Sequence, residues 1–302
     1  MRHIAVAVAL LVSVLQDQRA VFRSAAEAVR VDALATDGWR PVTGLTAHDF
    51  ELWDSGVAQK IESVDISELP FSVMLALDTS TSMKGAALRQ LQDGARAALD
   101  VLRPDDRASI LTFNSAAGRP TPWTADRGSL GAAIEQLSTA GTTSLFDAAF
   151  AAMVQRDPEP GRRNLLILFT DGDDTSSWLP DGAAYDLAAR TDIVVYGITT
   201  DATTSAQSGA LRWRSGVRLA LRQPIVSSTD FLSGLAERTG GKHLRSTATD
   251  LRRTFTQIVS EFRTRYVLWY RPEGVPATGW HPIDVRLKSG RGQLTARRGY
   301  ER

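Results

Sequence analysis

The sequence contains no cysteine, which excludes disulfide bridges, thiolate metal sites and cysteine nucleophiles together. It also lacks an excess of charge of either sign, because 35 Lys and Arg stand against 34 Asp and Glu and leave a net charge of +1. No overall field would draw such a protein onto nucleic acid or an anionic membrane. We therefore expect no nucleic-acid partner, and any partner must be recognised locally.

No apolar run is long enough to serve as a stable membrane anchor. The first residues place a basic Arg2 before an apolar run from Ile4 to Leu15, which is typical of the short core of an export signal. A buried N-terminal helix and a wrongly assigned start codon are the alternatives, because no small-x-small cleavage site follows the run directly. We expect a signal over residues 1–26 and a secreted or periplasmic protein, or a cytoplasmic one if these residues are not a signal.

Length and composition predict one main globular domain with small accessories. The 302 residues exceed a typical domain of about 100 to 200 residues. The contents of 43% hydrophobic and 23% charged residues are ordinary for a soluble protein. Residues 27–68 and 266–302 both alternate short strand-like runs with turns, and Asp54-Ser55-Gly56 is typical of a hairpin turn. We predict that these two flanks pack into one accessory β unit.

Residues 69–265 alternate apolar strand-like runs with amphipathic ones, which indicates a parallel sheet covered by helices on both faces. The fold class predicted here is a doubly wound, mostly parallel α/β domain. Residues 205–223 are less regular and carry four arginines, so we expect an insertion or a mobile loop there. The expected strands are Phe71–Asp78, Arg107–Asn114, Asn164–Asp171, Thr191–Thr199 and Lys242–Ser246, and the expected helices are Ala86–Leu102, Leu145–Gln155, Phe231–Thr239 and Leu251–Arg263.

Polar residues stand where the first and third of these strands end. Asp78, Ser80 and Ser82 follow the first strand, Asp171 ends the third, and Thr143 precedes a helix. The carboxyl ends of parallel strands meet at one edge of a sheet, where loops converge on ligands. Hard cations such as Mg²⁺ prefer oxygen ligands in a near-octahedral shell. These segments therefore predict a divalent-cation site.

Together the three segments resemble the metal-ion-dependent adhesion site of von Willebrand factor A domains, whose pattern is D-x-S-x-S, then a Thr, then an Asp. All five positions match. The resemblance implies direct ligation by Ser80, Ser82 and Thr143, with Asp78 and Asp171 supplying charge balance and water-held contacts. It also implies one open coordination position for an acidic side chain of a protein partner. The implied cation is Mg²⁺, with Mn²⁺ or Ca²⁺ as alternatives.

The surrounding sequence extends this resemblance. Thr143 is chosen over Thr142 because TSLFDA aligns with the T-x-L-x-D-A stretch of the family. Asp147 in that stretch is expected to cap or orient the following helix, or to hold a water near the cation. Residues 38–61 and 266–300 resemble the modules around the A domain in bacterial, often acidobacterial, VWFA-related proteins, so the resemblance covers nearly the whole chain after the expected signal.

The main functional prediction is binding without catalysis, because a partner carboxylate can complete the cation shell without any reaction. An enzymatic alternative is a haloacid-dehalogenase-like phosphotransferase, which also places an Asp at the end of a first strand. Its chemistry requires a second Asp two residues later, where this chain has Ser80. A structural scaffold is the other alternative, in which the metal only ties three loops together. Such a site closes its shell, whereas a binding site leaves room.

Overall fold

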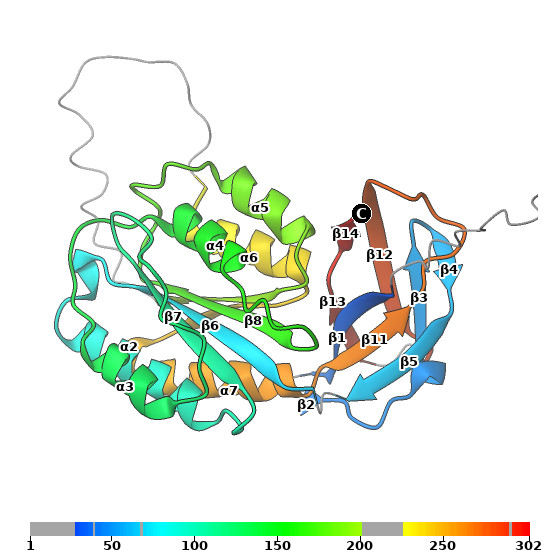
Figure 1. Cartoon of the computed structure of the whole chain (residues 1–302), viewed down its shortest axis with the longest axis horizontal. Coiled ribbons are helices and arrows are strands. Elements are labelled where there is room, and N and C mark those ends of the chain that lie inside the picture. Colours follow the sequence, from blue (N-terminus) through cyan, green and yellow to red (C-terminus); the bar gives the residue numbers. More distant parts are fainter. Residues whose placement is uncertain (1–27, 39, 67–68, 201–225, 290–291) are drawn as a thin grey trace, which may run out of the picture.

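The computed structural model consists of a parallel-sheet unit and a smaller β unit, packed end to end (Figure 1). This is the α/β architecture with an accessory β unit that the sequence predicts. The described residues are 28–38, 40–66, 69–200, 226–289 and 292–302. The expected signal and the expected insertion lie outside them. Within these ranges, no helix combines the length and the apolar character needed to cross a membrane.

Five parallel strands form the sheet of the larger unit, in the order β10-β9-β8-β6-β7. The chain passes from β6 to β7 on one side and returns to β8 on the other, so the strand order reverses between β6 and β8. Ligands of open parallel sheets bind outside the carboxyl ends of the strands at such a point. The strands are β6 (Phe71–Asp78), β7 (Arg107–Phe113), β8 (Arg163–Thr170), β9 (Val194–Thr200) and β10 (His243–Ser246).

Three helices cover each face of this sheet and enclose two apolar cores (Figure 1). The first face carries α2 (Ala86–Asp100), α3 (Arg127–Glu135) and α7 (Leu251–Arg263), and the second carries α4 (Leu145–Val154), α5 (Asp181–Ala189) and α6 (Ser228–Thr239). Helices α3 and α5 were not predicted from the sequence. Both are nine-residue helices rich in glycine and alanine, so large apolar residues do not recur clearly at the spacing of a helix. Short 3-10 turns occur at η1 (Ala47–Asp49), η2 (Thr81–Met83) and η3 (Ala248–Asp250).

The β unit combines strands from both flanks, as predicted. Strand β1 pairs with β11, and β3 pairs with β12, both antiparallel. The predicted hairpin turn joins β3 to β4, with Ser55 at φ 51° and Gly56 at φ 80°, as a two-residue turn between twisted strands requires. One sheet has the order β13-β1-β11-β5 with β2 beside β1, and the other has the order β14-β12-β3-β4. The strands are β1 (Val29–Asp37), β2 (Arg40–Pro41), β3 (Phe50–Asp54), β4 (Val57–Gln59), β5 (Ile61–Ile66), β11 (Tyr266–Tyr270), β12 (Trp280–Leu287), β13 (Gln293–Ala296) and β14 (Gly299–Glu301).

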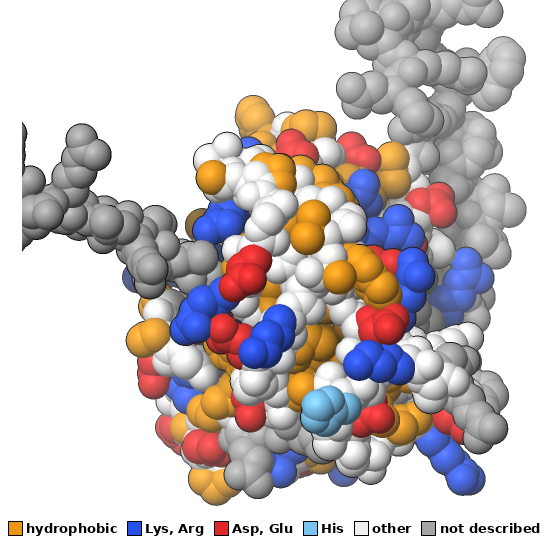
Figure 2. All heavy atoms as spheres, turned by 90° about the vertical axis from the view of Figure 1, so that its right-hand side faces the viewer, with side chains coloured by type: hydrophobic (Ala, Val, Ile, Leu, Met, Phe, Trp, Pro, Cys, Tyr) orange, Lys and Arg blue, Asp and Glu red, His pale blue; other side chains and the backbone are white. Residues whose placement is uncertain are grey.

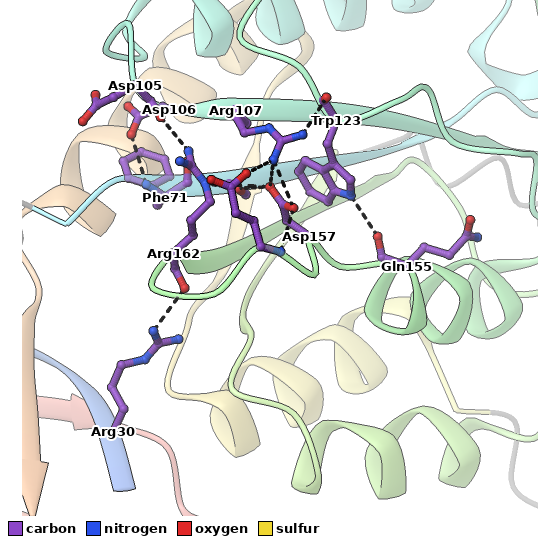
Figure 3. Close-up of polar contacts among 11 residues, drawn as sticks. Arg30, Phe71, Asp105, Asp106, Arg107, Trp123, Gln155, Asp157 and Arg162 are labelled. Atoms are coloured by element: carbon purple, nitrogen blue, oxygen red, sulfur yellow. Dashed lines mark hydrogen bonds and ion pairs between the residues drawn. The ribbon is translucent and has the colours of Figure 1, made fainter. Parts of the chain in front are cut away.

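The two units meet at the amino ends of the parallel strands, where polar side chains form a network (Figure 3). Arg30 of β1 donates from Nη1 to the carbonyl of Arg162 at 3.1 Å. Arg162 Nε donates to Ser72 Oγ at 2.9 Å, and Ser72 Oγ donates to Asp157 at 2.6 Å. The β unit thus leaves the carboxyl edge of the sheet, at the opposite end of the molecule, uncovered (Figure 1).

The outer end of the β unit carries basic, acidic and apolar side chains interspersed with one another (Figure 2). Among the described residues, no large patch of only basic or only acidic side chains covers this face, in agreement with the balanced composition.

Candidate metal centre

Asp78 is the last residue of β6, and its carboxylate is fully buried. Its Oδ1 accepts a hydrogen bond from the backbone N–H of Ser80 at 2.8 Å, and its Oδ2 accepts one from Thr170 Oγ1 at 2.6 Å. The carboxylate is therefore held from both strands that flank the reversal point. Burial raises the pKa of Asp78 to about 6, and the nearby charge of Asp171 adds to the increase.

Ser80 and Ser82 connect Asp78 to Asp171. Ser80 Oγ lies 2.9 Å from Ser82 Oγ, and Ser82 Oγ donates to Asp171 Oδ1 at 2.8 Å. The sharp turn η2 begins directly after Ser80 and brings the two hydroxyls together. Asp171 follows the end of β8, and burial raises the pKa of its carboxyl group as well. Four of the five predicted ligands thus form one hydrogen-bonded group.

Thr143 is the fifth predicted ligand and lies just before α4, with 6% of its surface exposed. Its backbone N–H donates to Thr175 Oγ1 at 3.0 Å, and its carbonyl accepts from the N–H groups of Thr175 at 2.8 Å and Ser176 at 3.1 Å. The threonine is therefore braced by the segment that follows Asp171. Its hydroxyl makes no hydrogen bond within the described part of the chain.

The loop before Thr143 is also tied to the loop after β6. The carbonyl of Gly141 accepts from Thr81 N at 3.1 Å and Thr81 Oγ1 at 2.8 Å, and Ala140 N donates to the carbonyl of Thr79 at 2.9 Å. All three predicted segments are consequently cross-linked at one edge of the sheet.

Gly141→Ala is expected to lower the free energy of unfolding by about 2–3 kcal/mol. Gly141 has φ 67°, which disfavours any side chain, and an added Cβ would clash with the Ser115 hydroxyl. Urea unfolding followed by circular dichroism measures the change. Gly131→Ala in α3 is the control, because a Cβ there meets no atom within 4 Å, and it is expected to be neutral or stabilising. Equal stability of the two variants would contradict a strained turn at Gly141.

The residues of this group fit a hard divalent cation. The donors are all oxygen atoms, which suits Mg²⁺. Among the described residues, no Arg, Lys or His pairs with Asp78 or Asp171, so the buried carboxylate of Asp78 and the half-buried one of Asp171 lack a positive partner. No cluster of three or more His, Cys, Asp or Glu side chains suited to a metal occurs in these residues. Cation binding here would therefore depend on the hydroxyl oxygens.

The residues that support this group were not predicted from the sequence. Thr170 fixes the Asp78 carboxylate, and Thr175 braces Thr143. The only available signal was the position of Thr170 beside Asp171 at the end of a strand. Asp147, for which two roles were left open, accepts hydrogen bonds on both carboxylate oxygens from the backbone N–H groups of Trp178 and Leu179, at 3.0 and 2.9 Å. It therefore orients the loop after β8.

Comparison with known proteins is consistent with this architecture. Residues 73–173, which run from β6 to just past the end of β8, match the family model described as the von Willebrand factor type A domain. A von Willebrand factor type A structure from Catenulispora acidiphila is similar over 91% of this chain and 72% of its own, with 12% identity and a TM-score of 0.51.

A second solved structure is proximal thread matrix protein 1 from the mussel byssus, with a zinc-occupied MIDAS motif. It is similar over 69% of this chain and 49% of its own, with 14% identity and a TM-score of 0.50. At these identities the likeness shows a shared fold. Taken with the family match over residues 73–173 and the strand order, it shows that the larger unit has the fold of a von Willebrand factor type A domain.

Proposed function

We propose that this protein is a non-catalytic binding module that recognises an acidic side chain of a protein partner through a divalent cation. Ser80, Ser82 and Thr143 would hold the cation, and Asp78 and Asp171 would balance its charge. The bound cation supplies a Lewis-acidic coordination position for a carboxylate. The observation that carries the proposal is the hydroxyl and carboxylate group around Ser82, which has no basic partner among the described residues.

The exposure of the group favours a binding site over a structural one. Asp78 is 0% exposed and Ser80 is 2% exposed, whereas Ser82 lies at the surface. One side of the group is therefore buried in the protein, and the other side faces the solvent. A structural site tends to close its shell, while a site for a partner leaves one side accessible. Mg²⁺ is the proposed cation, with Mn²⁺ or Ca²⁺ as alternatives, and the mussel protein shows that the shared fold can hold a divalent ion in its MIDAS motif.

The arrangement around Asp78 also supports a non-catalytic role. A haloacid-dehalogenase-like phosphotransferase requires a carboxylic acid two residues after the first Asp. Ser80 occupies that position and its hydroxyl lies 2.9 Å from that of Ser82, so no general acid stands there.

Calorimetric titration with Mg²⁺ and with Mn²⁺ tests the proposal. The full chain is expected to bind both ions, and Ser80→Ala/Ser82→Ala is expected to bind them more than about 100-fold less tightly. Loss of a residue that merely orients a ligand already costs about 10–100-fold in metal affinity, and this variant removes two ligands. Circular dichroism checks that the variant is folded.

Thr247→Ala/Thr249→Ala is the matched control. These two hydroxyls have the same spacing as Ser80 and Ser82 and lie 3.0 Å apart, but they belong to the segment around η3. The control is expected to bind both ions as the wild type does. A wild-type chain that binds neither ion, or a serine variant that binds them normally, would contradict the proposed site.

A further inference from the structure

Trp178 is 91% exposed, far more than the other exposed large hydrophobic side chains of the described residues. The next values are 52% for Val154 and 46% for Trp280. Tryptophan is highly buried on average, because its indole is large and apolar. A single exposed apolar residue needs no explanation by itself. An exposed tryptophan on a firmly held loop is less common.

The backbone at Trp178 is fixed on both sides. Its N–H donates to Asp147 Oδ2 at 3.0 Å, and the N–H of Leu179 donates to Asp147 Oδ1 at 2.9 Å. On the other side, Ser177 Oγ accepts from the N–H groups of Phe146 and Asp147, each at 3.1 Å. The loop is therefore attached to the first turn of α4, and the exposed indole projects from a firmly attached segment.

The same segment contains parts of the candidate metal centre. It begins at Asp171, and in its middle Thr175 and Ser176 bind the carbonyl of Thr143. Trp178 follows two residues later. Asp171 and Trp178 thus lie on the same loop, which leaves the carboxyl end of β8 at the edge of the sheet away from the β unit (Figure 1).

The acidic side chains of this segment already accept hydrogen bonds from the protein. Asp173 accepts from Ser228 N at 2.7 Å, and Asp174 accepts from Ser177 Oγ at 2.5 Å. Trp178 is therefore the large apolar side chain of this segment that is exposed for contact with a partner. A single contact between a cation and a carboxylate covers little area, whereas a specific interface buries about 800 Å² on each partner. Tryptophan is among the residues that contribute most to such interfaces.

We propose that Trp178 is the residue by which this domain selects its partner. Its indole enters an apolar cavity on a folded protein, next to the carboxylate that completes the cation shell. A protruding side chain requires a concave partner surface, which an extended acidic peptide does not provide. The inference rests on the proposed function and adds the apolar contact to the ionic one.

A displayed library of a small three-helix scaffold with randomised surface positions is the probe. Binders are selected on the full chain in Mg²⁺ and eluted with EDTA, so that cation-dependent binders are recovered. Their affinity is expected to fall about tenfold or more for Trp178→Ala and to fall less for Trp178→Phe. Trp280→Ala, which removes a half-exposed tryptophan from β12 of the β unit, is the control and is expected to change affinity less than twofold.

Titration with Mg²⁺ separates the two proposals. Trp178→Ala is expected to bind Mg²⁺ as the wild type does, because the indole is not a ligand. Binders that EDTA releases but that bind Trp178→Ala as tightly as the wild type would overturn the role of Trp178 and leave the proposed function standing. Loss of Mg²⁺ affinity in Trp178→Ala would overturn it too, since the residue would then act on the metal centre. If EDTA releases no binder, both proposals fail.

Discussion

Asp32→Ala is expected to lower the free energy of unfolding by about 3–5 kcal/mol. Asp32 lies on β1 of the β unit. Its Oδ1 accepts a hydrogen bond from Arg163 Nε at 2.7 Å and forms an ion pair with Arg163 Nη2 at 2.6 Å. Arg163 is fully buried at the start of β8. The substitution would leave this guanidinium without its anion, between the two units, beside the positive charges of Arg30 and Arg265. An unpaired buried charge is among the most destabilising changes a protein can undergo.

The pH dependence of this effect follows from the pKa of Asp32. Burial alone would raise that pKa, but Arg163, Arg30 and Arg265 together hold it below its ordinary value. A carboxyl group with a lowered pKa in the folded state stabilises the fold above its unfolded pKa of about 3.9 and loses this contribution as the pH falls further. The difference between wild type and Asp32→Ala should therefore be full at neutral pH and shrink in strong acid.

Urea unfolding at pH 7 and in acid measures both effects. Asp37→Ala is the control, since it removes an exposed carboxylate from the end of the same strand and is expected to change stability by less than about 0.5 kcal/mol. A double variant with Arg163→Met should lose less stability than the sum of the single variants, because it removes both charges. If Asp32→Ala were as stable as Asp37→Ala, the ion pair between Asp32 and Arg163 would not contribute to stability as expected.

Asp54→Ala is expected to have an effect of similar size, about 3–5 kcal/mol, inside the β unit. Asp54 ends β3 and is fully buried. One carboxylate oxygen accepts from His281 Nδ1 and Ser55 Oγ, and the other accepts from the hydroxyls of Tyr270 and Tyr300, all at 2.9 Å. Tyr270 lies in one sheet of the β unit and Tyr300 in the other, so this carboxylate joins the two sheets. Its removal leaves buried donors without an acceptor.

A graded series tests the role of Asp54 by thermal or urea unfolding. Tyr300→Phe removes one donor and leaves the carboxylate with three, so it is expected to cost about 1 kcal/mol. Asp284→Ala is the matched control on the neighbouring strand β12, where the carboxylate forms a surface ion pair with Arg286, and a change within about 0.5 kcal/mol is expected. Three variants of equal stability would show that the buried network adds nothing to the fold.

The parallel sheet could be predicted because its signals are local. The runs now seen as β6 and β8 are apolar at their centres and buried along their whole length, so both faces must be covered, and the polar residues that end them must then share an edge. Prediction was less accurate where a cap decides the boundary. Helix α6 was expected from Phe231, but it begins at Ser228 because Ser227 Oγ accepts from Asp230 N at 3.1 Å.

The residues of the candidate centre could be proposed from the sequence, but the hydrogen bonds that position them could not. The spacing of Asp78, Ser80 and Ser82 indicated that their oxygens would converge. The contacts that fix the group come from elsewhere, since Thr170 is 92 residues from Asp78, and Thr175 is 32 residues from Thr143. Hydrogen bonds between loops depend on how the strands are ordered in the sheet. They cannot be predicted from the residue pattern of a single strand.

By itself the sequence determined the alternation of strands and helices and the hairpin turn, because periodicity and turn residues act over short distances along the chain. The five candidate ligands were proposed from the spacing of the motif. Only the tertiary structure decided that Asp32 pairs with Arg163, 131 residues away. It alone also decided that Asp54 joins the two sheets of the β unit, and that Trp178 is exposed rather than packed. Charge pairing and exposure depend on which elements meet in space, and that follows from the packing of the whole chain.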